Sequence, residues 1–191
     1  MSNLFEDQKK VLQDFTERLE NLGISYMLTG SMAMTGYAMM RMTADIDIVL
    51  ELSTQNIEEF IKEFEKDYYI PQARVRDSVA RKFMFNILHE EKLVKIDCVI
   101  RKENEFQTQA FAHRKRIKFA NDLYLWIISR EDLILSKLSW AKTSKSEIQL
   151  RDVANIIRNG YDKEYVEIWA DRLEIKDLLD EALKKIEENA D

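Results

Sequence analysis

The feature that most constrains this chain is a pair of aspartates set into a short apolar run. Asp45 and Asp47 alternate with Ile46 and Ile48, and the run continues to Leu50. This compact, β-branched pattern predicts a buried strand. Because residues two apart in a strand project from the same face, we expect the two carboxylates to lie side by side at the edge of an apolar sheet.

A cation is needed to hold two carboxylates so close together, because like charges repel and burial raises the free energy of each ionised group. Mg²⁺ suits this position, since it prefers carboxylate oxygens and shares its remaining positions with water and phosphates. A third acid, Asp97, occupies the same kind of position in the apolar run 93–100. If the two strands are neighbours, the three carboxylates converge. The alternative is that each aspartate is an ordinary surface or turn residue.

A second candidate feature is the pair Gly30 and Ser31, which follows the apolar run 24–28. A glycine at the end of a strand lets the backbone approach a ligand closely. Ser31 would then open a helix whose N–H groups and dipole favour an anion. Such a pair is common at strand–helix junctions, and its position upstream of the aspartate pair is what makes it specific. We interpret it as a phosphate-binding element.

Hydrophobic periodicity divides the chain into an α/β half and a helical half. The expected strands cover about 24–28, 46–50, 82–88, 93–100, 116–119 and 123–127, and the expected helices about 4–22, 54–67, 129–140, 146–158, 162–171 and 175–188. A capping-box pattern opens the helix at Ser129. We therefore expect an α/β core with an N-terminal helix over residues 1–128, built on a mixed sheet flanked by helices. A helical C-terminal segment would cover residues 129–191.

Composition excludes several other classes of protein. The chain has 191 residues, of which 46% are apolar and 34% charged, so it has enough apolar residues for a core and is not disordered. A single cysteine, Cys98, excludes a disulfide scaffold. No apolar stretch approaches the ~20 residues that a membrane span needs, and the first ten residues do not resemble a signal peptide. We expect a cytoplasmic protein with no membrane partner.

Charge is unevenly distributed along the chain. Residues 71–118 contain twelve lysines and arginines against six acids, whereas residues 161–191 contain eleven acids against five bases. The basic excess could attract phosphate or nucleic acid. Alternatively, it is the solvated surface of a strand-rich region. The acidic C-terminal stretch disfavours binding of a duplex over the whole surface.

These residues together resemble the signature of the nucleotidyltransferase (polymerase-β-like) superfamily. The resemblance rests on Gly30-Ser31, on the stretch Arg41-x-Thr43-x-Asp45-Ile46-Asp47, and on Asp97. Within the superfamily, the stretch 41–47 is similar to the bacterial abortive-infection, type IV toxin-like nucleotidyltransferases, the AbiEii group. A helix that carries Lys137, followed by Arg151-Asp152, adds to the similarity. It extends over about residues 24–157, and the later helices match no pattern.

The resemblance implies a nucleotidyltransferase fold and a Mg²⁺-dependent enzyme that transfers NMP from an NTP to a hydroxyl acceptor. It further implies two metal ions, which could stabilise the attacking and leaving oxygens. In that scheme Asp45 and Asp47 would bind the metals. Asp97 would complete the site or help to deprotonate the acceptor. Gly30 and Ser31 would hold the β- and γ-phosphates.

The resemblance also assigns roles in the helical half. The α/β half offers no obvious cation beside its acids, so we expect Lys137 to contact the triphosphate and Asp152 to orient it. We also expect Lys137→Ala to leave the melting temperature nearly unchanged. The alternative is that both are ordinary surface residues. The three tryptophans are interpreted as packing residues: Trp126, Trp140 and Trp169.

The identity of the acceptor is left open by the sequence. The partners implied are an NTP, an acceptor that is an RNA 3′ end, a protein side chain or a small molecule, and a cognate antitoxin protein if the chain is a toxin–antitoxin component. One alternative is a catalytically inactive protein of this fold with a binding or regulatory role. Another is a helical interaction protein in which the aspartate pair is incidental. The intact set of carboxylates argues against the first, and the strand-like setting of Asp47 and Asp97 argues against the second.

Overall fold

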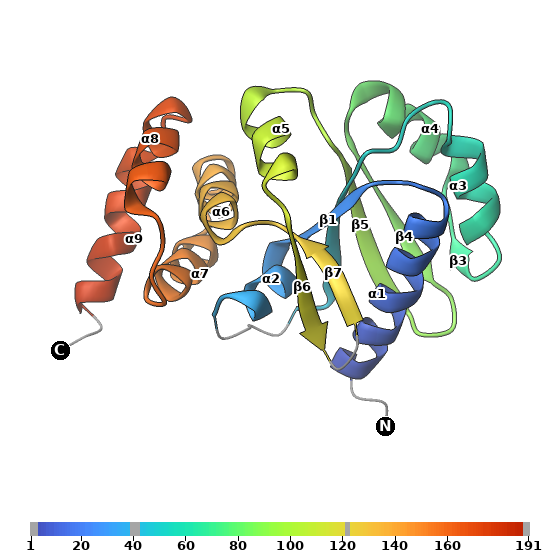
Figure 1. Ribbon diagram of the computed structural model, residues 1–191, viewed down its shortest axis with the longest axis horizontal. Coiled ribbons are helices and arrows are strands. Elements are labelled where there is room, and N and C mark those ends of the chain that lie inside the picture. Colours follow the sequence, from blue (N-terminus) through green and yellow to red (C-terminus); the bar gives the residue numbers. More distant parts are fainter. Residues whose placement is uncertain (1–3, 39–42, 121–122, 189–191) are drawn as a thin grey trace.

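The computed structural model describes residues 4–38, 43–120 and 123–188. In these residues the chain forms one mixed sheet of seven strands in the order β3-β4-β5-β2-β1-β7-β6. Helices flank the sheet, and the last four helices lie together at one end of the molecule (Figure 1). The predicted fold class, a mixed sheet flanked by helices with a helical C-terminal segment, is confirmed.

The strands are short, and most lie where apolar alternation predicts them. Their bounds are Tyr26–Thr29 (β1), Asp45–Leu50 (β2), Tyr68–Tyr69 (β3), Met84–His89 (β4), Val94–Ile100 (β5), Lys115–Ala120 (β6) and Leu123–Ile127 (β7). The α-helices are Leu4–Asn21 (α1), Gly30–Ala33 (α2), Ile57–Phe64 (α3), Gln72–Arg81 (α4), Glu105–Ala112 (α5), Arg130–Ser144 (α6), Glu147–Ile157 (α7), Lys163–Arg172 (α8) and Lys176–Glu188 (α9). A 3₁₀ turn at Met34–Gly36 (η1) continues α2.

The two faces of the central strands differ in burial. In β2 the side chains of Ile46 and Ile48 are fully buried, whereas the alternate aspartates are only partly buried. The apolar face packs under α1 and α3, where the ring of Phe60 lies 6.4 Å from Phe15 and 5.9 Å from Phe85 of β4. This aromatic cluster fixes the apolar face of β2, and the period of two therefore turns Asp45 and Asp47 to the opposite face.

The helical half begins at an N-cap that the sequence predicts. The Ser129 side chain accepts a hydrogen bond from the Asp132 N–H, so α6 begins at Arg130. Helix α6 packs against α7 and α8, and α9 packs against α7 (Figure 1). None of the helices that the structure describes is both long and apolar enough to cross a bilayer.

The sequence does not predict helices α4 and α5, and helix α3 is shorter in the structure than the sequence predicts. Helix α4 buries only Val75, Ser78 and Val79, and α5 only Ala110 and Phe111. Each of these short helices buries so few residues that its apolar pattern is brief. Helix α3 begins later than predicted because residues 53–56 form a turn, in which Asn56 Oδ1 accepts from the Ser53 N–H at 2.8 Å.

Candidate active site

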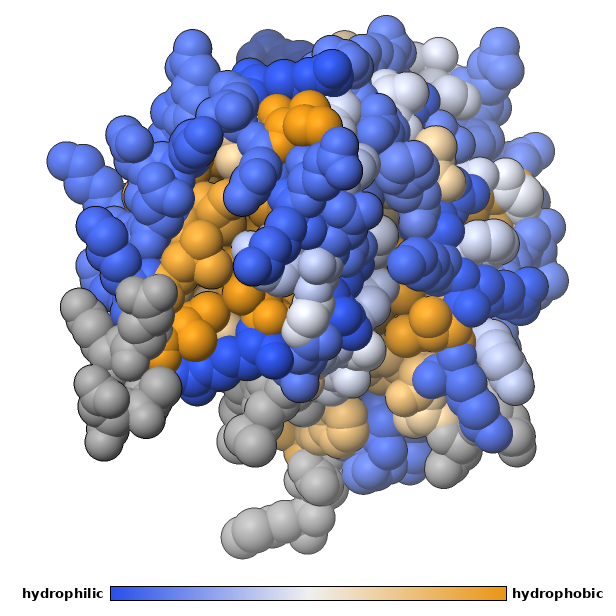
Figure 2. Space-filling view, turned by 60° about the vertical axis from the view of Figure 1, so that its left-hand side comes forward, coloured by the Kyte–Doolittle hydropathy of each residue, from blue (hydrophilic) through white to orange (hydrophobic). Residues whose placement is uncertain are grey.

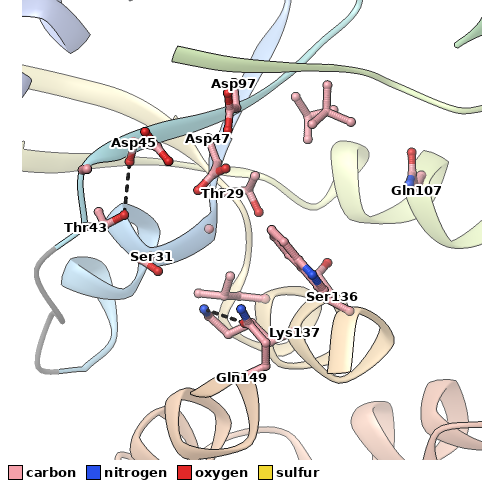
Figure 3. Close-up of a pocket in the computed structure, with 16 residues that line it drawn as sticks. Thr29, Ser31, Thr43, Asp45, Asp47, Asp97, Gln107, Ser136, Lys137 and Gln149 are labelled. Carbon is pink, nitrogen blue, oxygen red and sulfur yellow. Dashed lines mark hydrogen bonds between the residues drawn. The ribbon is translucent and has the colours of Figure 1, made fainter. Parts of the chain in front are cut away.

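A cavity of about 580 Å³ lies between the polar face of the central strands and helices α6 and α7. The α/β half and the helical half both contribute side chains to it. Figure 3 shows the aspartates of β2 and β5 on one side and Lys137 and Gln149 on the other. Of the residues predicted from the sequence, those that line the cavity are Gly30, Ser31, Asp45, Asp47, Asp97 and Lys137. Asp152 does not line it, but pairs with Lys137.

Strand register brings the three carboxylates together. Strands β2 and β5 are parallel neighbours, and Asp47 lies opposite Asp97 in their ladder. On its other side Asp47 lies opposite Thr29 of the antiparallel strand β1. Asp45 shares the face of Asp47 two residues earlier, so all three acids project into the same cavity.

Lys95 lies beside these acids and was not predicted as a site residue. Its Nζ is 3.1 Å from Asp45 Oδ2 and 3.1 Å from Asp97 Oδ2. The expectation that the α/β half supplies no cation next to its acids is therefore wrong. The sequence does contain the signal, because Lys95 is two residues before Asp97 in one strand and so shares its face.

Burial and repulsion act together on Asp47. Its pKa is raised to about 6, first because the carboxyl is buried and then because the charges of Asp97 and Asp45 are near. The positive charges of Lys137 and Lys95 oppose this rise. A raised carboxyl pKa means that negative charge is unfavourable at this place. An additional cation would therefore be strongly stabilised here.

The carboxylates fit a hard divalent cation by their chemistry. Asp97 Oδ1 is buried and has no hydrogen-bond partner in the described part of the chain, so one carboxylate oxygen remains to be satisfied. As they stand, no three acidic, histidine or cysteine side chains among the described residues are arranged so as to enclose a metal ion. The ammonium of Lys95 lies between two of the acids. Asp45, Asp47 and Asp97 would hold the cation once that ammonium moved away.

Gly30 is required by the close approach of its backbone to Asp47. Its φ is +65°, and a Cβ at this position would overlap the Asp47 carboxylate. Helix α2, which Gly30 opens, is a single turn that continues into η1. The phosphate-binding element predicted at Gly30 and Ser31 would therefore depend on the N–H groups of one turn rather than on the dipole of a long helix.

Replacing Gly30 by alanine is expected to reduce the free energy of unfolding by about 3 kcal/mol, because a strained φ adds to the overlap with Asp47. Gly23→Ala is the matched control. Gly23 has a φ of +66°, but nothing lies within 4 Å of its added Cβ. The control should lose only about 1 kcal/mol. Urea unfolding measures both variants, and equal losses would show that the contact with Asp47 is unimportant.

Lys137 and Asp152 form a buried ion pair rather than a solvated surface pair. Lys137 Nζ is 2.8 Å from Asp152 Oδ2, and each side chain is only 4% exposed. Lys137 also donates to Gln149 Oε1 of α7 at 3.3 Å. The sequence-based expectation that Lys137→Ala leaves the melting temperature unchanged does not suit such a pair, since removing one partner leaves the other buried and uncompensated.

The cavity is also lined by residues to which the sequence assigns a different role or no role. Trp140 was interpreted as a packing residue, yet 55% of it is exposed, and it lines the cavity. Gln107 of α5 lines the same cavity from a helix that the sequence did not predict. Thr43 lies at its rim, where its carbonyl accepts from Gln8 Nε2 at 2.9 Å. Arg41, the other residue of the motif before β2, lies outside the described residues.

Comparison with known proteins gives one family match and several structural likenesses. The profile of a family described as "Nucleotidyltransferase of unknown function (DUF6036)" matches residues 2–181. No curated protein sequence matches the chain. A crystal structure of an antigenic nucleotidyltransferase-like protein from Paracoccidioides brasiliensis is similar to this fold with a TM-score of 0.58. The two are 17% identical, and the match covers 94% of this chain and 93% of the other.

A second solved structure is more distant. It is the lincosamide antibiotic adenylyltransferase LnuA with lincomycin bound, and it is 20% identical over 77% of this chain and 94% of its own. Its TM-score of 0.47 is too low to bear on the activity of this chain.

Proposed function

Since this chain belongs to the nucleotidyltransferase family described as DUF6036, we propose that it is a Mg²⁺-dependent enzyme that transfers NMP from an NTP to a hydroxyl acceptor. The observation that carries this proposal is the register of β2 and β5. It places Asp47 opposite Asp97 at a cavity that Lys137 enters from the other side. Carboxylates facing a lysine across such a cavity suit a metal–polyphosphate ligand.

In this proposal the acidic side chains would bind metal ions, and the positive and N–H groups would bind phosphates. Asp45, Asp47 and Asp97 would hold one or two Mg²⁺ ions, which when bound offset phosphate charge and polarise the reacting phosphoryl group. Lys137 would contact the triphosphate as a positive charge, held in place by Asp152. The N–H groups at Gly30 and Ser31 would contact the β- and γ-phosphates.

The two halves of the chain would both be needed for this function. We propose residues 1–128 as the nucleotidyltransferase core with its N-terminal helix and residues 129–191 as the helical segment. The cavity takes its aspartates from the first and Lys137 from the second. On this division, neither half alone would bind an NTP as the whole chain does.

The acceptor and the biological role belong to the same proposal. An RNA 3′ end, a protein side chain and a small molecule all offer the hydroxyl group that the reaction needs. The stretch 41–47, similar to that of the AbiEii group, supports a role in abortive infection or in a toxin–antitoxin pair, with a cognate antitoxin as partner.

The test combines binding with transfer. We expect ATP, CTP, GTP or UTP to raise the melting temperature in the presence of Mg²⁺ but not with EDTA. Incubation with each α-³²P-labelled NTP and a cell extract, separated into RNA, protein and small-molecule fractions, should then label one fraction. If no nucleotide stabilises the protein and no fraction is labelled, the proposal is wrong, and a catalytically inactive protein of this fold is the better description.

A further inference from the structure

Trp140 is a large apolar side chain exposed inside the candidate active site. Among the described residues, the large apolar side chains with substantial exposure are Leu4, Tyr69, Phe83, Leu93, Tyr124, Trp140, Ile148 and Ile168. Trp140 is the member of this set that lines the cavity. Figure 2 brings the helical side forward and shows apolar residues at the surface among mostly polar ones. Its place in a cavity separates Trp140 from scattered surface residues, which need no explanation.

Packing of α6 does not account for this exposure. The helix is held by other faces, on which Ile134, Leu135 and Leu138 are completely buried. In the part of the chain that the structure describes, the indole ring of Trp140 has no aromatic, cationic or hydrogen-bonding partner. Its carbonyl oxygen accepts from the side chains of Thr143 and Ser144, which concerns the backbone alone. The ring is therefore available to a ligand.

The position of Trp140 relative to Lys137 indicates which part of a ligand it meets. Both residues lie on α6 and line the cavity, three residues and thus about one turn apart. Lys137 is 4% exposed and supplies positive charge that acts on Asp47. Trp140 supplies a flat apolar surface, and the amide side chains of Gln107 and Gln149 line the same cavity. A nucleotide has a matching group for each of these features: phosphates for the positive charge, an aromatic base for the flat apolar surface, and polar atoms on that base for the amides.

We propose that Trp140 stacks on the nucleobase of the bound NTP and gives the site a preference for purines. This inference rests on the proposed function, since it assumes that the polyphosphate lies between Lys137 and the aspartates. A base stacked on an aromatic side chain contributes about a tenfold gain in affinity or more. Purines present a larger ring face than pyrimidines, so the gain is greater for ATP and GTP than for CTP and UTP.

The test separates recognition of the ring from recognition of the phosphates. Equilibrium binding is measured in Mg²⁺ for ATP, for CTP and for inorganic tripolyphosphate, which has no base. Trp140→Ala should weaken ATP binding about tenfold, weaken CTP binding less, and change tripolyphosphate binding by less than twofold. Trp140→Phe keeps a ring and should retain most of the ATP affinity. Ile148→Ala, which removes an exposed side chain of α7 outside the cavity, is the matched control and should change none of these.

Each outcome decides between the two proposals. If the wild-type protein binds tripolyphosphate and ATP equally well, or if Trp140→Ala weakens both to the same extent, stacking on the base is refuted while the proposed function stands. The same holds if ATP binding is unchanged in Trp140→Ala, in which case the ring serves the acceptor or no ligand. If neither compound binds in Mg²⁺, the proposed function fails and this inference fails with it. Circular dichroism establishes that each variant is folded.

Discussion

Replacing Asp47 by asparagine is expected to lower nucleotidyl transfer at least 1000-fold, to about the background rate, while the protein remains folded. Asp47 lies between Thr29 and Asp97 in the sheet, on the face that lines the cavity. Asparagine keeps the shape of the side chain but removes the negative charge that a divalent cation requires. The transfer assay with α-³²P-labelled NTP measures the loss.

The same variant is expected to be more stable than the wild-type protein, but only at pH values above about 4. The pKa of Asp47 is raised to about 6 from an ordinary value of 3.8, so the folded protein holds this proton more tightly than the unfolded chain. Ionisation therefore destabilises the folded wild-type protein as pH rises from about 4 to 6. Asparagine escapes this loss, which amounts to about 2 to 3 kcal/mol at pH 8 and to about 0.5 kcal/mol at pH 4.

Thermal melts in EDTA at pH 4 and pH 8 measure this difference directly. Asp77→Asn on α4 is the control, because Asp77 is an exposed acid that pairs with Arg81 and does not line the cavity. It should change neither transfer nor the pH dependence of stability. Retention of more than a tenth of the wild-type activity in Asp47→Asn, or a lower melting temperature than wild type at pH 8, would contradict the assignment of Asp47.

Replacing Lys137 by alanine is expected to lower both stability and turnover. Its partner Asp152 is 4% exposed and would remain buried without compensation, which reduces the free energy of unfolding by about 3 to 5 kcal/mol. The loss of positive charge opposite the aspartates should weaken NTP binding and lower turnover about 100-fold. Urea unfolding and steady-state kinetics at a temperature where the variant is folded measure the two effects.

A double variant separates the structural role of this pair from its role toward the nucleotide. Lys137→Met combined with Asp152→Leu replaces a buried ion pair with apolar groups, and such replacements are often neutral or stabilising. We expect its stability to return close to that of the wild-type protein while turnover stays low. Lys142→Ala removes an exposed lysine of the same helix, paired with Glu174, and should affect neither. Recovery of turnover in the double variant would show that Lys137 only supports the fold.

Local patterns in the sequence predict much of this molecule, and long-range pairing explains most of what they miss. The alternation around Asp47 predicts β2 and its two faces without reference to any other strand. That Asp97 lies opposite Asp47 depends on β5 pairing with β2, which no local pattern contains. The position of Lys95 follows from the same pairing. Each of these residues could be proposed for the site, but only the register of the sheet brings them together.

Burial in the helical half could not be predicted for a related reason. The sequence indicates that α6 is a helix that begins at a Ser129 cap. It does not indicate how α6 is rotated against α7 and the sheet. That rotation buries Lys137 against Asp152 and leaves Trp140 exposed in the cavity. The lysine is thus buried and the tryptophan one turn away is exposed, which is the reverse of what the chemistry of the two side chains alone suggests.

The cavity draws on residues from Thr29 to Gln149, and this order has a consequence for synthesis on the ribosome. Chains emerge and fold from the N-terminus. An unfinished chain that ends before α6 carries the carboxylates of β2 and β5 but not the lysine that faces them. A chain that ends still earlier, before β7, also lacks the parallel neighbour of β1 and the strand that leads directly into α6. Under the proposed function, nascent chains would therefore acquire the complete set of nucleotide contacts only after α7 has been translated, and shorter chains would not consume NTP.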